Sequence, residues 1–283
     1  MEYFKALSTS SSLNMGSNLD KVKVSVSLLT FTRMSGLGCV KIIIAGTGSA
    51  LNPFRGQSSV IVDGGGTIVT VDLGCQAPNV AEKLEVKLDE AQAHIVTHEH
   101  YDHICGLPMV AFVKTFRSAL PELKVYAPPT ASEYLKKLLQ LTAGSWKIGF
   151  NVEPVKVGGR VRVGDLEFQF IEAVHTVEAL SVIIKHRDLK IVVSGDTRPT
   201  SAFKKEAEKA DLAIHEATFP SRMAVEAASA GHSTVSEALS QLENSNLGIL
   251  YHLTRESEEE ALTVLRGHGR IIVAGDGAVL RLC

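Results

Sequence analysis

The sequence of 283 residues is poor in cysteine and in aromatic residues, and it has no strong excess of either charge. The four cysteines show no Cys-x-x-Cys spacing, so we expect them to be free thiols in a reducing cytoplasm. They are Cys39, Cys75, Cys105 and Cys283. A formal net charge of -2 is unlike that of a dedicated nucleic-acid-binding protein.

The sequence also lacks long hydrophobic runs. None approaches the roughly 18 apolar residues that a transmembrane helix needs. The first five residues, Met1 to Lys5, do not combine a basic region with an apolar one, which argues against a secretory signal. With 45% hydrophobic and 21% charged residues, the composition is that of an ordinary globular protein. We therefore expect a cytoplasmic protein that does not bind membranes.

Histidine is concentrated in one short segment, Thr97 to His103, directly after the apolar run 93–96. In extended backbone His98 and His100 project to the same side, because side chains alternate with period two. Asp102 and His103 follow at once and can face a second point nearby. Neutral imidazoles with a carboxylate suit zinc, with iron or manganese as alternatives. The segment predicts a catalytic metal site better than it fits a histidine-rich surface loop.

Further candidate ligands follow three apolar runs downstream. His175 comes after 168–174, Asp196 after 191–195 and His252 after 248–251. Polar residues at strand ends form the active sites of many α/β proteins. A site with two metal ions needs such additional ligands and a bridging carboxylate. His252 alone could be an ordinary loop residue, but the residues together indicate one centre.

These segments resemble the metallo-β-lactamase superfamily, and more closely its ribonuclease Z-like branch, from about Val40 to the C-terminus. The His-Glu-Ala-Thr-Phe and His-Ser-Thr segments are similar to ribonuclease Z and its phosphodiesterase relatives in particular. The resemblance rests on residues 45–49, 71–74, 97–108, 175, 194–199, 215–219, 231–234 and 252.

The resemblance implies two divalent ions per chain, zinc first, with Mn²⁺ or Fe²⁺ as alternatives. Such a pair can bridge a hydroxide and lower the pKa of its parent water toward about 7. The first ion would bind His98, His100 and His175, the second would bind Asp102, His103 and His252, and Asp196 would bridge both.

The resemblance also assigns roles around the ligands. Asp72 would orient a ligating histidine from behind, as such sites require. His232 would donate a proton to the leaving group, with Glu216 orienting it, since a histidine beside a carboxylate is a common general acid. The alternative is that His232 merely precedes the helix cap at Ser233 and Thr234. We count Asp102, His232 and Glu216 as the catalytic residues.

The fold implied by the resemblance is α/β: a four-layered αβ/βα sandwich of two mixed sheets with helices on the outer faces. One hydrolase domain would cover residues 39–283, with its halves meeting near residue 165. Residues 1–38 form an N-terminal extension. The alternation at 21–32 predicts an extra edge strand. Alternatively, the natural protein starts near Met34.

Periodicity predicts the elements inside the domain. Three helix starts carry capping-box patterns, Thr130/Glu133, Thr234/Glu237 and Ser257/Glu260, and Gly267 and Gly269 would end the last helix. The predicted helices are 107–118, 131–142, 201–209, 235–244 and 256–266. The predicted strands are 40–45, 58–63, 67–72, 93–97, 123–127, 166–174, 180–185, 189–194, 211–215, 247–252 and 270–275.

The expected function is hydrolysis of a phosphate ester. The stretch from Ile104 to Val163 is rich in Lys and Arg, which suits a phosphate-bearing substrate. However, the segment between His175 and Asp196 leaves no room for the tRNA-gripping arm often inserted there in ribonuclease Z. The loop 51–57 also departs from the basic loop of that branch.

A phosphodiesterase for small or cyclic phosphodiesters therefore comes first. A tRNA 3′-endoribonuclease that would bind RNA comes second, a lactonase or other ester hydrolase third, and a non-catalytic metal-binding regulatory protein stays open. We expect a homodimer.

Overall fold

Strand β3 (Val40–Gly46) shows why this chain folds in layers. Its side chains alternate between two faces, and both faces are buried. Ile42 and Ile44 lie in the core between the two sheets, whereas Ile43 and Ala45 lie in a second core beneath helices. A strand that is apolar on both faces requires cover on both sides, and here a second sheet and a helical layer provide it.

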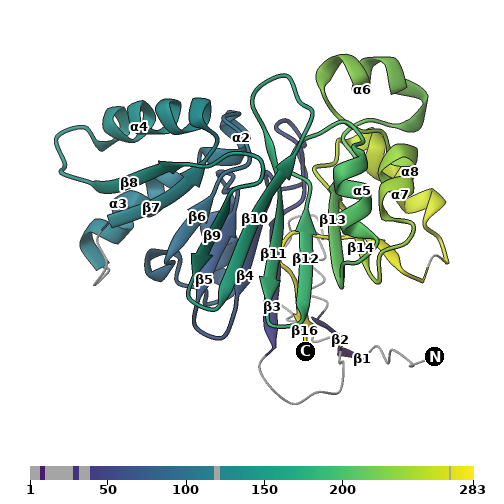
Figure 1. Cartoon of the computed structure of the whole chain (residues 1–283), viewed down its shortest axis with the longest axis horizontal. Coiled ribbons are helices and arrows are strands. Elements are labelled where there is room, and N and C mark those ends of the chain that lie inside the picture. The colour runs from purple at the N-terminus through teal and green to yellow at the C-terminus, as the bar shows by residue number, and fades with distance from the viewer. Residues whose placement is uncertain (1–6, 10–27, 32–38, 118–121, 268) are drawn as a thin grey trace, which may run out of the picture.

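The computed structural model describes residues 7–9, 28–31, 39–117, 122–267 and 269–283. Two mixed sheets face each other, and helices cover their outer faces (Figure 1). This is the four-layered αβ/βα sandwich predicted from the sequence, which the structure confirms. One core fills the space between the two sheets. Each sheet also has one core between it and the helices that cover it.

The first sheet has nine strands in the order β1-β2-β16-β3-β4-β5-β6-β7-β8. Strands β5 to β8 run parallel to one another, so their carboxyl ends meet at one edge. Besides β3, its strands are β1 (Leu7–Thr9), β2 (Leu28–Phe31), β4 (Ser59–Asp63), β5 (Ile68–Val71), β6 (Ala93–Ile95), β7 (Glu122–Ala127), β8 (Gly149–Pro154) and β16 (Ala278–Leu282).

The second sheet has seven strands in the order β15-β14-β13-β12-β11-β10-β9. Strands β12 to β15 run parallel, and their carboxyl ends again share one edge. Its strands are β9 (Arg160–Val163), β10 (Leu166–Glu172), β11 (Leu180–His186), β12 (Leu189–Val193), β13 (Leu212–Glu216), β14 (Gly248–Tyr251) and β15 (Ile271–Val273).

The helices divide between the two outer layers. Side chains of α1, α3 and α4 enter the core of the first sheet, and those of α5, α7 and α8 enter the core of the second. The short helices α2 and α6 stand at the edge where the strands end (Figure 1). The bounds are α1 (Ala77–Lys83), α2 (Tyr101–Ile104), α3 (Leu107–Arg117), α4 (Pro129–Ala143), α5 (Ser201–Ala207), α6 (Ala224–Ala230), α7 (Val235–Leu242) and α8 (Arg255–Val264), with single 3-10 turns at Leu88–Glu90 and Ser221–Met223.

The two halves do not divide the chain as simply as predicted. The second sheet begins at β9, close to the expected boundary at residue 165. The last strand, β16, then returns to the first sheet, where it pairs antiparallel with β3. In the N-terminal extension β2 pairs with β16 and β1 pairs with β2. The predicted strand at 21–32 falls mostly outside the described residues, which there include 28–31.

Helix starts were predicted with mixed success. Thr234 caps α7 in a capping box with Glu237, as expected. The box at α8 lies one turn earlier than predicted, between Thr254 and Ser257, because the helix already begins at residue 255. Helix α4 begins at Pro129, so Thr130 lies inside the helix, where its hydroxyl bonds to Glu178 instead.

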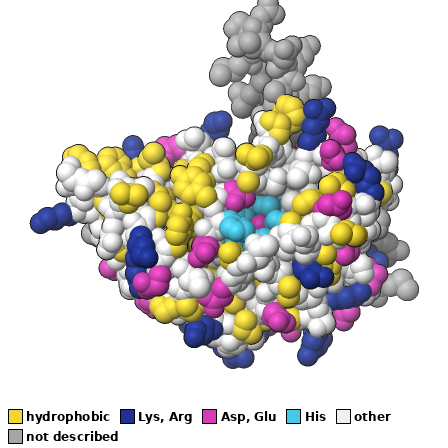
Figure 2. All heavy atoms as spheres, turned by 90° about the horizontal axis from the view of Figure 1, so that it is seen from above, with side chains coloured by type: hydrophobic (Ala, Val, Ile, Leu, Met, Phe, Trp, Pro, Cys, Tyr) yellow, Lys and Arg dark blue, Asp and Glu magenta, His cyan; other side chains and the backbone are white. Residues whose placement is uncertain are grey.

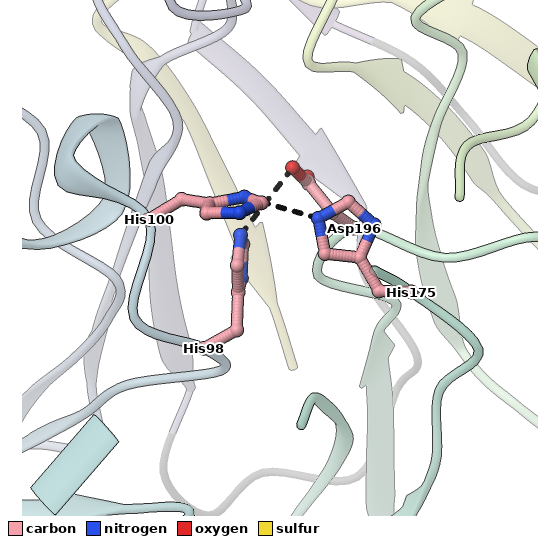
Figure 3. Close-up of side chains that lie close together, drawn as sticks. All are labelled: His98, His100, His175 and Asp196. Atoms are coloured by element: carbon pink, nitrogen blue, oxygen red, sulfur yellow. Dashed lines mark hydrogen bonds and ion pairs between the residues drawn. The ribbon is translucent and has the colours of Figure 1, made fainter. Parts of the chain in front are cut away.

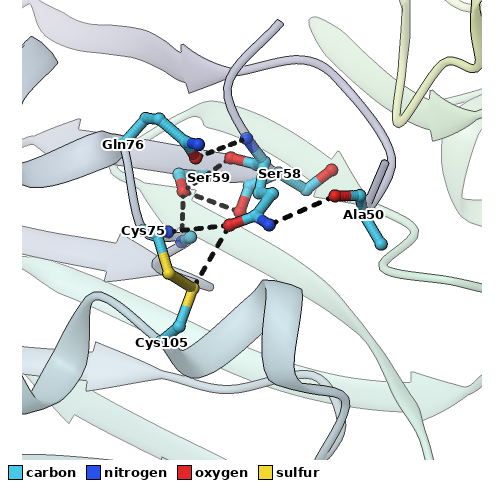
Figure 4. The surroundings of a disulfide bond; sticks show 8 residues. Ala50, Ser58, Ser59, Cys75, Gln76 and Cys105 are labelled. Atoms are coloured by element: carbon cyan, nitrogen blue, oxygen red, sulfur yellow. Dashed lines mark hydrogen bonds between the residues drawn. A yellow bond between two sulfur atoms is a disulfide. The ribbon is translucent and has the colours of Figure 1, made fainter. Parts of the chain in front are cut away.

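The expectation of free thiols was wrong. Cys39 is disulfide-bonded to Cys283, and Cys75 is bonded to Cys105, which leaves no free cysteine. The first bond joins the segment before β3 to the end of β16, since antiparallel pairing brings these ends together. The second joins the turn after β5 to the segment after α2 (Figure 4).

Candidate metal centre and active site

The predicted ligands meet where the strand ends of both sheets converge. Asp72 follows β5 and His98 follows β6 in the first sheet, while Asp196 follows β12 and His252 follows β14 in the second. Parallel strands bring their carboxyl ends to one edge, and here the edges of two sheets face each other. Figure 2 shows the histidine side chains at the bottom of a hollow on this face.

Four residues form a first cluster, from three loops and two sheets (Figure 3). His98 Nε2 lies 3.6 Å from Asp196 Oδ2, and His100 Nδ1 lies 3.1 Å from His175 Nε2. One ligand-type atom from each residue lies within 4.8 Å of every other. Three imidazole nitrogens and a carboxylate oxygen at this separation are the donor set of a zinc-type site.

A second cluster adjoins the first and shares Asp196. Asp102 Oδ2 lies 3.6 Å from His103 Nε2 and 3.3 Å from His252 Nε2. Asp196 Oδ2 lies 3.2 Å from the same nitrogen of His103 and 3.3 Å from that of His252. One carboxylate oxygen therefore faces both clusters, which is the position of a bridging ligand between two metal ions.

Several buried polar atoms in these clusters have no hydrogen-bond partner among the described residues. They are His98 Nε2, His103 Nε2 and Asp196 Oδ1. A buried polar atom left without a partner costs about 1–3 kcal/mol. A divalent cation would satisfy these atoms together, so the residues present fit such an ion.

The opposite ring nitrogens are hydrogen-bonded, which fixes which nitrogen faces the centre. His103 Nδ1 donates to Asp72 Oδ2 at 2.8 Å, and His175 Nδ1 donates to the Gly231 carbonyl at 2.7 Å. His98 Nδ1 lies 3.0 Å from Thr97 Oγ1. Metal-binding histidines are oriented in this way in general.

Asp72 organises the first half of the site from beneath. Its carboxylate is buried and accepts hydrogen bonds from Thr97 N, from Thr97 Oγ1 and from His103 Nδ1. Its backbone has φ 56, an uncommon value for a residue other than glycine. That conformation turns the chain sharply after β5 and directs the carboxylate toward the histidines.

Charge is concentrated at the centre of the site. Burial opposes the charged form of His103, but Asp196 and Asp72 outweigh it and hold the pKa of this imidazole well above its usual value. For His98, burial among other imidazoles holds the pKa well below the usual value, so this ring is neutral. A neutral imidazole is the form that binds metal.

His232 and Glu216 form a pair next to the clusters. His232 Nδ1 donates to Glu216 Oε1 at 2.9 Å, and the carboxylate is fully buried. Burial disfavours the imidazolium, but attraction to Glu216 and the hydrogen bond to it prevail and raise the pKa of His232 to about 9. The ring stacks on His252 with a centroid distance of 5.4 Å. The structure therefore brings together all the predicted site residues.

Three residues of the site lie in segments that carry the resemblance but were assigned no role from the sequence. Thr97, Thr218 and the carbonyl of Gly231 each bond to a ring nitrogen on the outer side of a histidine. A hydroxyl or a carbonyl in this role could have been found only by looking next to each predicted ligand. His94 is buried in β6 and bonds to Thr70 Oγ1 at 2.9 Å, away from the clusters.

The loop 51–57 lies beside the second cluster. Asn52 Nδ2 donates to the carbonyl of Leu253, the residue after His252. The guanidinium of Arg55 is held by Glu258, at 2.7 Å from Nε, and also bonds to Thr47 Oγ1. Because its donors are committed inside the protein, Arg55 does not offer a free charge to a substrate.

A family model described as "Anti-Pycsar protein Apyc1" matches residues 40–265. The chain is also 31% identical over 217 residues to "Ribonuclease Z 2, mitochondrial" of Schizosaccharomyces pombe, a match that covers 72% of this chain. The match spans only 32% of the length of that yeast protein. With the ribonuclease Z of Pyrococcus horikoshii the identity is 23% over 306 residues, covering 85% of this chain and 98% of the relative.

Solved structures show the same architecture. The metallo-β-lactamase fold protein YhfI of Bacillus subtilis superposes with a TM-score of 0.73. The sequence identity is 22%, and the match covers 87% of this chain and 100% of YhfI. At this identity the similarity shows the fold and nothing finer.

Proposed function

Because the chain belongs to the anti-Pycsar protein Apyc1 family, in the ribonuclease Z-like branch of the metallo-β-lactamase superfamily, we propose a two-metal phosphodiesterase for small or cyclic diesters. The chain is a metal-dependent hydrolase, as this branch is. What we propose beyond that is the number of metal ions, zinc as the metal, the roles of the site residues and the class of substrate.

The observation that carries the proposal is the His232–Glu216 pair beside a shared metal-type cluster. A phosphodiester bond breaks to release an alkoxide, which needs a proton when it is a poor leaving group. Glu216 holds His232 Nδ1, so Nε2 is the nitrogen that can deliver a proton. A thioester releases a thiolate, which leaves without a proton, so it does not require this arrangement to the same degree.

The proposed mechanism assigns each residue one task. Two bound divalent ions would acidify the attacking water and polarise the phosphoryl oxygen. His98, His100 and His175 would hold one ion, Asp102, His103 and His252 the other, with Asp196 touching both. His232 would protonate the leaving oxygen, and Glu216 would keep the ring in the orientation and charge state that this step needs.

The connection between His175 and Asp196 supports small substrates. It consists of the hairpin β11–β12, whose strands pair directly through His186 and Leu189. No arm that could reach a distant part of a tRNA extends from it. A substrate would therefore be held mainly where its phosphate meets the metal centre.

Ribonuclease Z activity remains the second candidate, because curated relatives carry that name. The basic stretch from Ile104 to Val163, which suits a phosphate-bearing substrate, is partly neutralised in the structure. Lys114 is buried and donates to the carbonyls of Asp89 and Ala91. Lys124 lies 3.5 Å from Glu153 in an ion pair. These charges are partly used within the protein.

A comparison of substrates tests the proposal. The zinc-loaded protein should hydrolyse bis(p-nitrophenyl) phosphate and cyclic nucleoside monophosphates at least as efficiently as it cleaves a tRNA precursor. Preference for the precursor at its 3′ end would promote the endoribonuclease. Turnover of lactones alone would favour an ester hydrolase, and no turnover despite full metal content would favour a regulatory protein.

We further propose a homodimer that forms through an exposed aromatic patch on the side of α3. The rings of Phe112, Phe116 and Trp146 contact one another, with centroids 5.0–6.0 Å apart, and are 39–54% exposed. Figure 2 shows apolar side chains gathered on that side of the hollow. Light scattering should give a dimer for the wild type and a monomer for Trp146→Ser. Leu262→Ser on α8, 51% exposed, is the control.

The cytoplasmic location stays a prediction. Among the described residues, no helix is long and apolar enough to cross a membrane. The two disulfide bonds point toward an oxidising environment, because such bonds are rare in the cytosol. Alkylation of thiols in intact cells before lysis tests the location. Labelling of all four cysteines would support the cytoplasm, and labelling of no cysteine would contradict a cytoplasmic location.

A further inference from the structure

We propose that Thr218 is a positioning residue: its hydroxyl fixes the ring of His252 for the second metal ion and connects it through Glu216 to His232. The inference rests on the proposed two-metal centre and adds a residue to it. Thr218 follows β13 and is buried, and its Oγ1 lies within hydrogen-bond distance of both His252 Nδ1 and Glu216 Oε2.

The hydrogen bonds that link His252, Thr218 and Glu216 have a defined direction. His252 Nε2 faces the carboxylates of Asp102 and Asp196, each at 3.3 Å, which is where a metal ion would bind. A metal-bound nitrogen carries no proton, so the ring proton must be on Nδ1. It is donated to Thr218 Oγ1 at 2.8 Å. The hydroxyl proton of Thr218 then has two acceptors, Glu216 Oε2 at 2.7 Å and the His252 carbonyl at 3.2 Å, and the shorter bond goes to the carboxylate.

Glu216 accepts each of the hydrogen bonds that it makes, and this maintains the direction of the hydrogen bonds from His252 and Thr218. Its Oε1 accepts from Thr197 N, Ser233 N and His232 Nδ1, and its Oε2 accepts from the amide and the hydroxyl of Thr218. A fully buried carboxylate surrounded only by donors has no partner to which it could donate. The path therefore runs without a break from His252 through Thr218 and Glu216 to His232.

The backbone of His252 makes such an anchor necessary. Its φ is 52, in the left-handed region that residues other than glycine rarely adopt. The side chain is thereby turned out of the regular alternation of β14, so the strand does not determine where the ring points. Its ring nitrogens contact Thr218 on one side and the carboxylates on the other.

The other half of the site contains the same series of hydrogen bonds. His98 Nδ1 bonds to Thr97 Oγ1 at 3.0 Å, Thr97 Oγ1 donates to Asp72 Oδ2 at 2.8 Å, and Asp72 accepts from His103 Nδ1. Histidine, threonine, carboxylate and histidine follow in the same order as in the Thr218 path. A threonine hydroxyl therefore contacts the outer ring nitrogen of two proposed ligands, His98 and His252.

Metal binding by Thr218→Val tests the inference, because valine keeps the shape and removes the hydroxyl. Loss of such an orienting partner typically weakens metal affinity about 10–100-fold. Competition between the apoprotein and a chelator, with zinc as the probe, should show the second ion bound that much more weakly. The first ion should bind as in the wild type. Thr218→Ser should restore the affinity, and saturating zinc should restore two ions in Thr218→Val.

Thr70→Val is the matched control. It removes a buried threonine hydroxyl that also bonds to a histidine ring, but one outside the clusters. Its zinc affinities should equal those of the wild type, which separates the specific effect from the general cost of losing a buried hydroxyl.

The results separate the inference from the function on which it rests. Wild-type affinity at both sites in Thr218→Val would overturn the role of Thr218, even if the enzyme is an active phosphodiesterase. Two ions in the wild type without diester turnover would overturn the proposed function and leave the affinity comparison valid. A wild type that binds no zinc would overturn both.

Discussion

At the scale of single residues, Asp196 has the most consequential position. Its Oδ2 lies 3.2–3.6 Å from nitrogens of His98, His103 and His252, so it faces both clusters at once. We expect two zinc ions per wild-type chain and close to none in Asp196→Ala. Elemental analysis after gel filtration measures this, with Asp188→Ala in the exposed β11–β12 turn as the control. One ion retained in Asp196→Ala would show that it does not bridge.

His232 should act on the leaving group alone. His232→Ala should keep its metal, because the Nδ1 of this residue is committed to Glu216. Hydrolysis of alkyl diesters should fall by about 10²–10⁴-fold, the usual contribution of a general acid. Esters of p-nitrophenol leave without a proton and should be affected much less. An equal loss on both kinds of ester, measured as kcat, would assign His232 a structural role.

His94 should make the protein sensitive to acid. Burial lowers the pKa of its imidazole from 6.5 to about 3. Between these values the unfolded chain binds a proton that the folded chain does not, so folding stability is present above about pH 6.5 and is lost as the pH falls. The loss is about 1.4 kcal/mol per pH unit for one proton. His94→Asn should show a flatter decline in urea unfolding between about pH 7 and 5, and an unchanged slope would contradict this.

The chemistry of a side chain determines whether the sequence alone can indicate its role in the site. His98 to His103 and Asp196 stand out because histidines and carboxylates at strand ends have few other uses. Thr97 and Thr218 do not stand out, since threonine is common in strands and turns and its hydroxyl matters here only through its neighbours. Their roles depend on pairings between segments far apart in the chain.

At the scale of elements, the start of α7 is important because the site segment 231–234 leads into it. The Thr234 side chain accepts from Glu237 N, and Glu237 bonds back to the amide of Thr234. Thr234→Ala should cost about 1 kcal/mol, the typical value of an N-cap. Chemical denaturation measures it, with Thr263→Ala on the exposed face of α8 as the control. Equal effects of the two changes would show that the cap contributes nothing.

Elements were predicted well where they are buried and poorly where they are not. The predicted strands all occur, because runs such as Ile42–Ala45 are apolar on both faces. Strands β8 and β9 were missed, since they carry polar residues toward solvent on the outer edges of the sheets. Strand β16 was missed as well, although most of its side chains are buried. Helix α6 is a single short alanine-rich stretch with only Ala227 buried, so it shows no amphipathic period.

At the scale of the whole molecule, the hairpin between His175 and Asp196 carries no arm that could grip a long nucleic acid. We expect any RNA binding to depend weakly on salt, with a slope of log K against log salt that corresponds to two or three phosphate contacts. Each contact contributes about −0.7 on a single strand. Binding measured over a range of salt concentrations tests this. A steep slope with tight binding of a tRNA precursor would move the endoribonuclease to first place.

The overall fold was predictable because the resemblance covers the domain from about Val40, and the four layers follow from strands that are apolar on both faces. The return of β16 to the first sheet was not predictable, since a short run such as 278–282 looks the same in either sheet. The disulfide bonds were not predictable for a similar reason. Cys39 and Cys283 become neighbours only through that pairing.

The proposed ligands are divided between the two sheets, and this division has a consequence for how the protein unfolds. His98, His100, Asp102 and His103 belong to the first half, while His175, Asp196 and His252 belong to the second. Ions bound across this boundary would be released as soon as either half opened. Metal occupancy thus links the melting of one half to that of the other, and the holoprotein gains cooperativity in addition to stability.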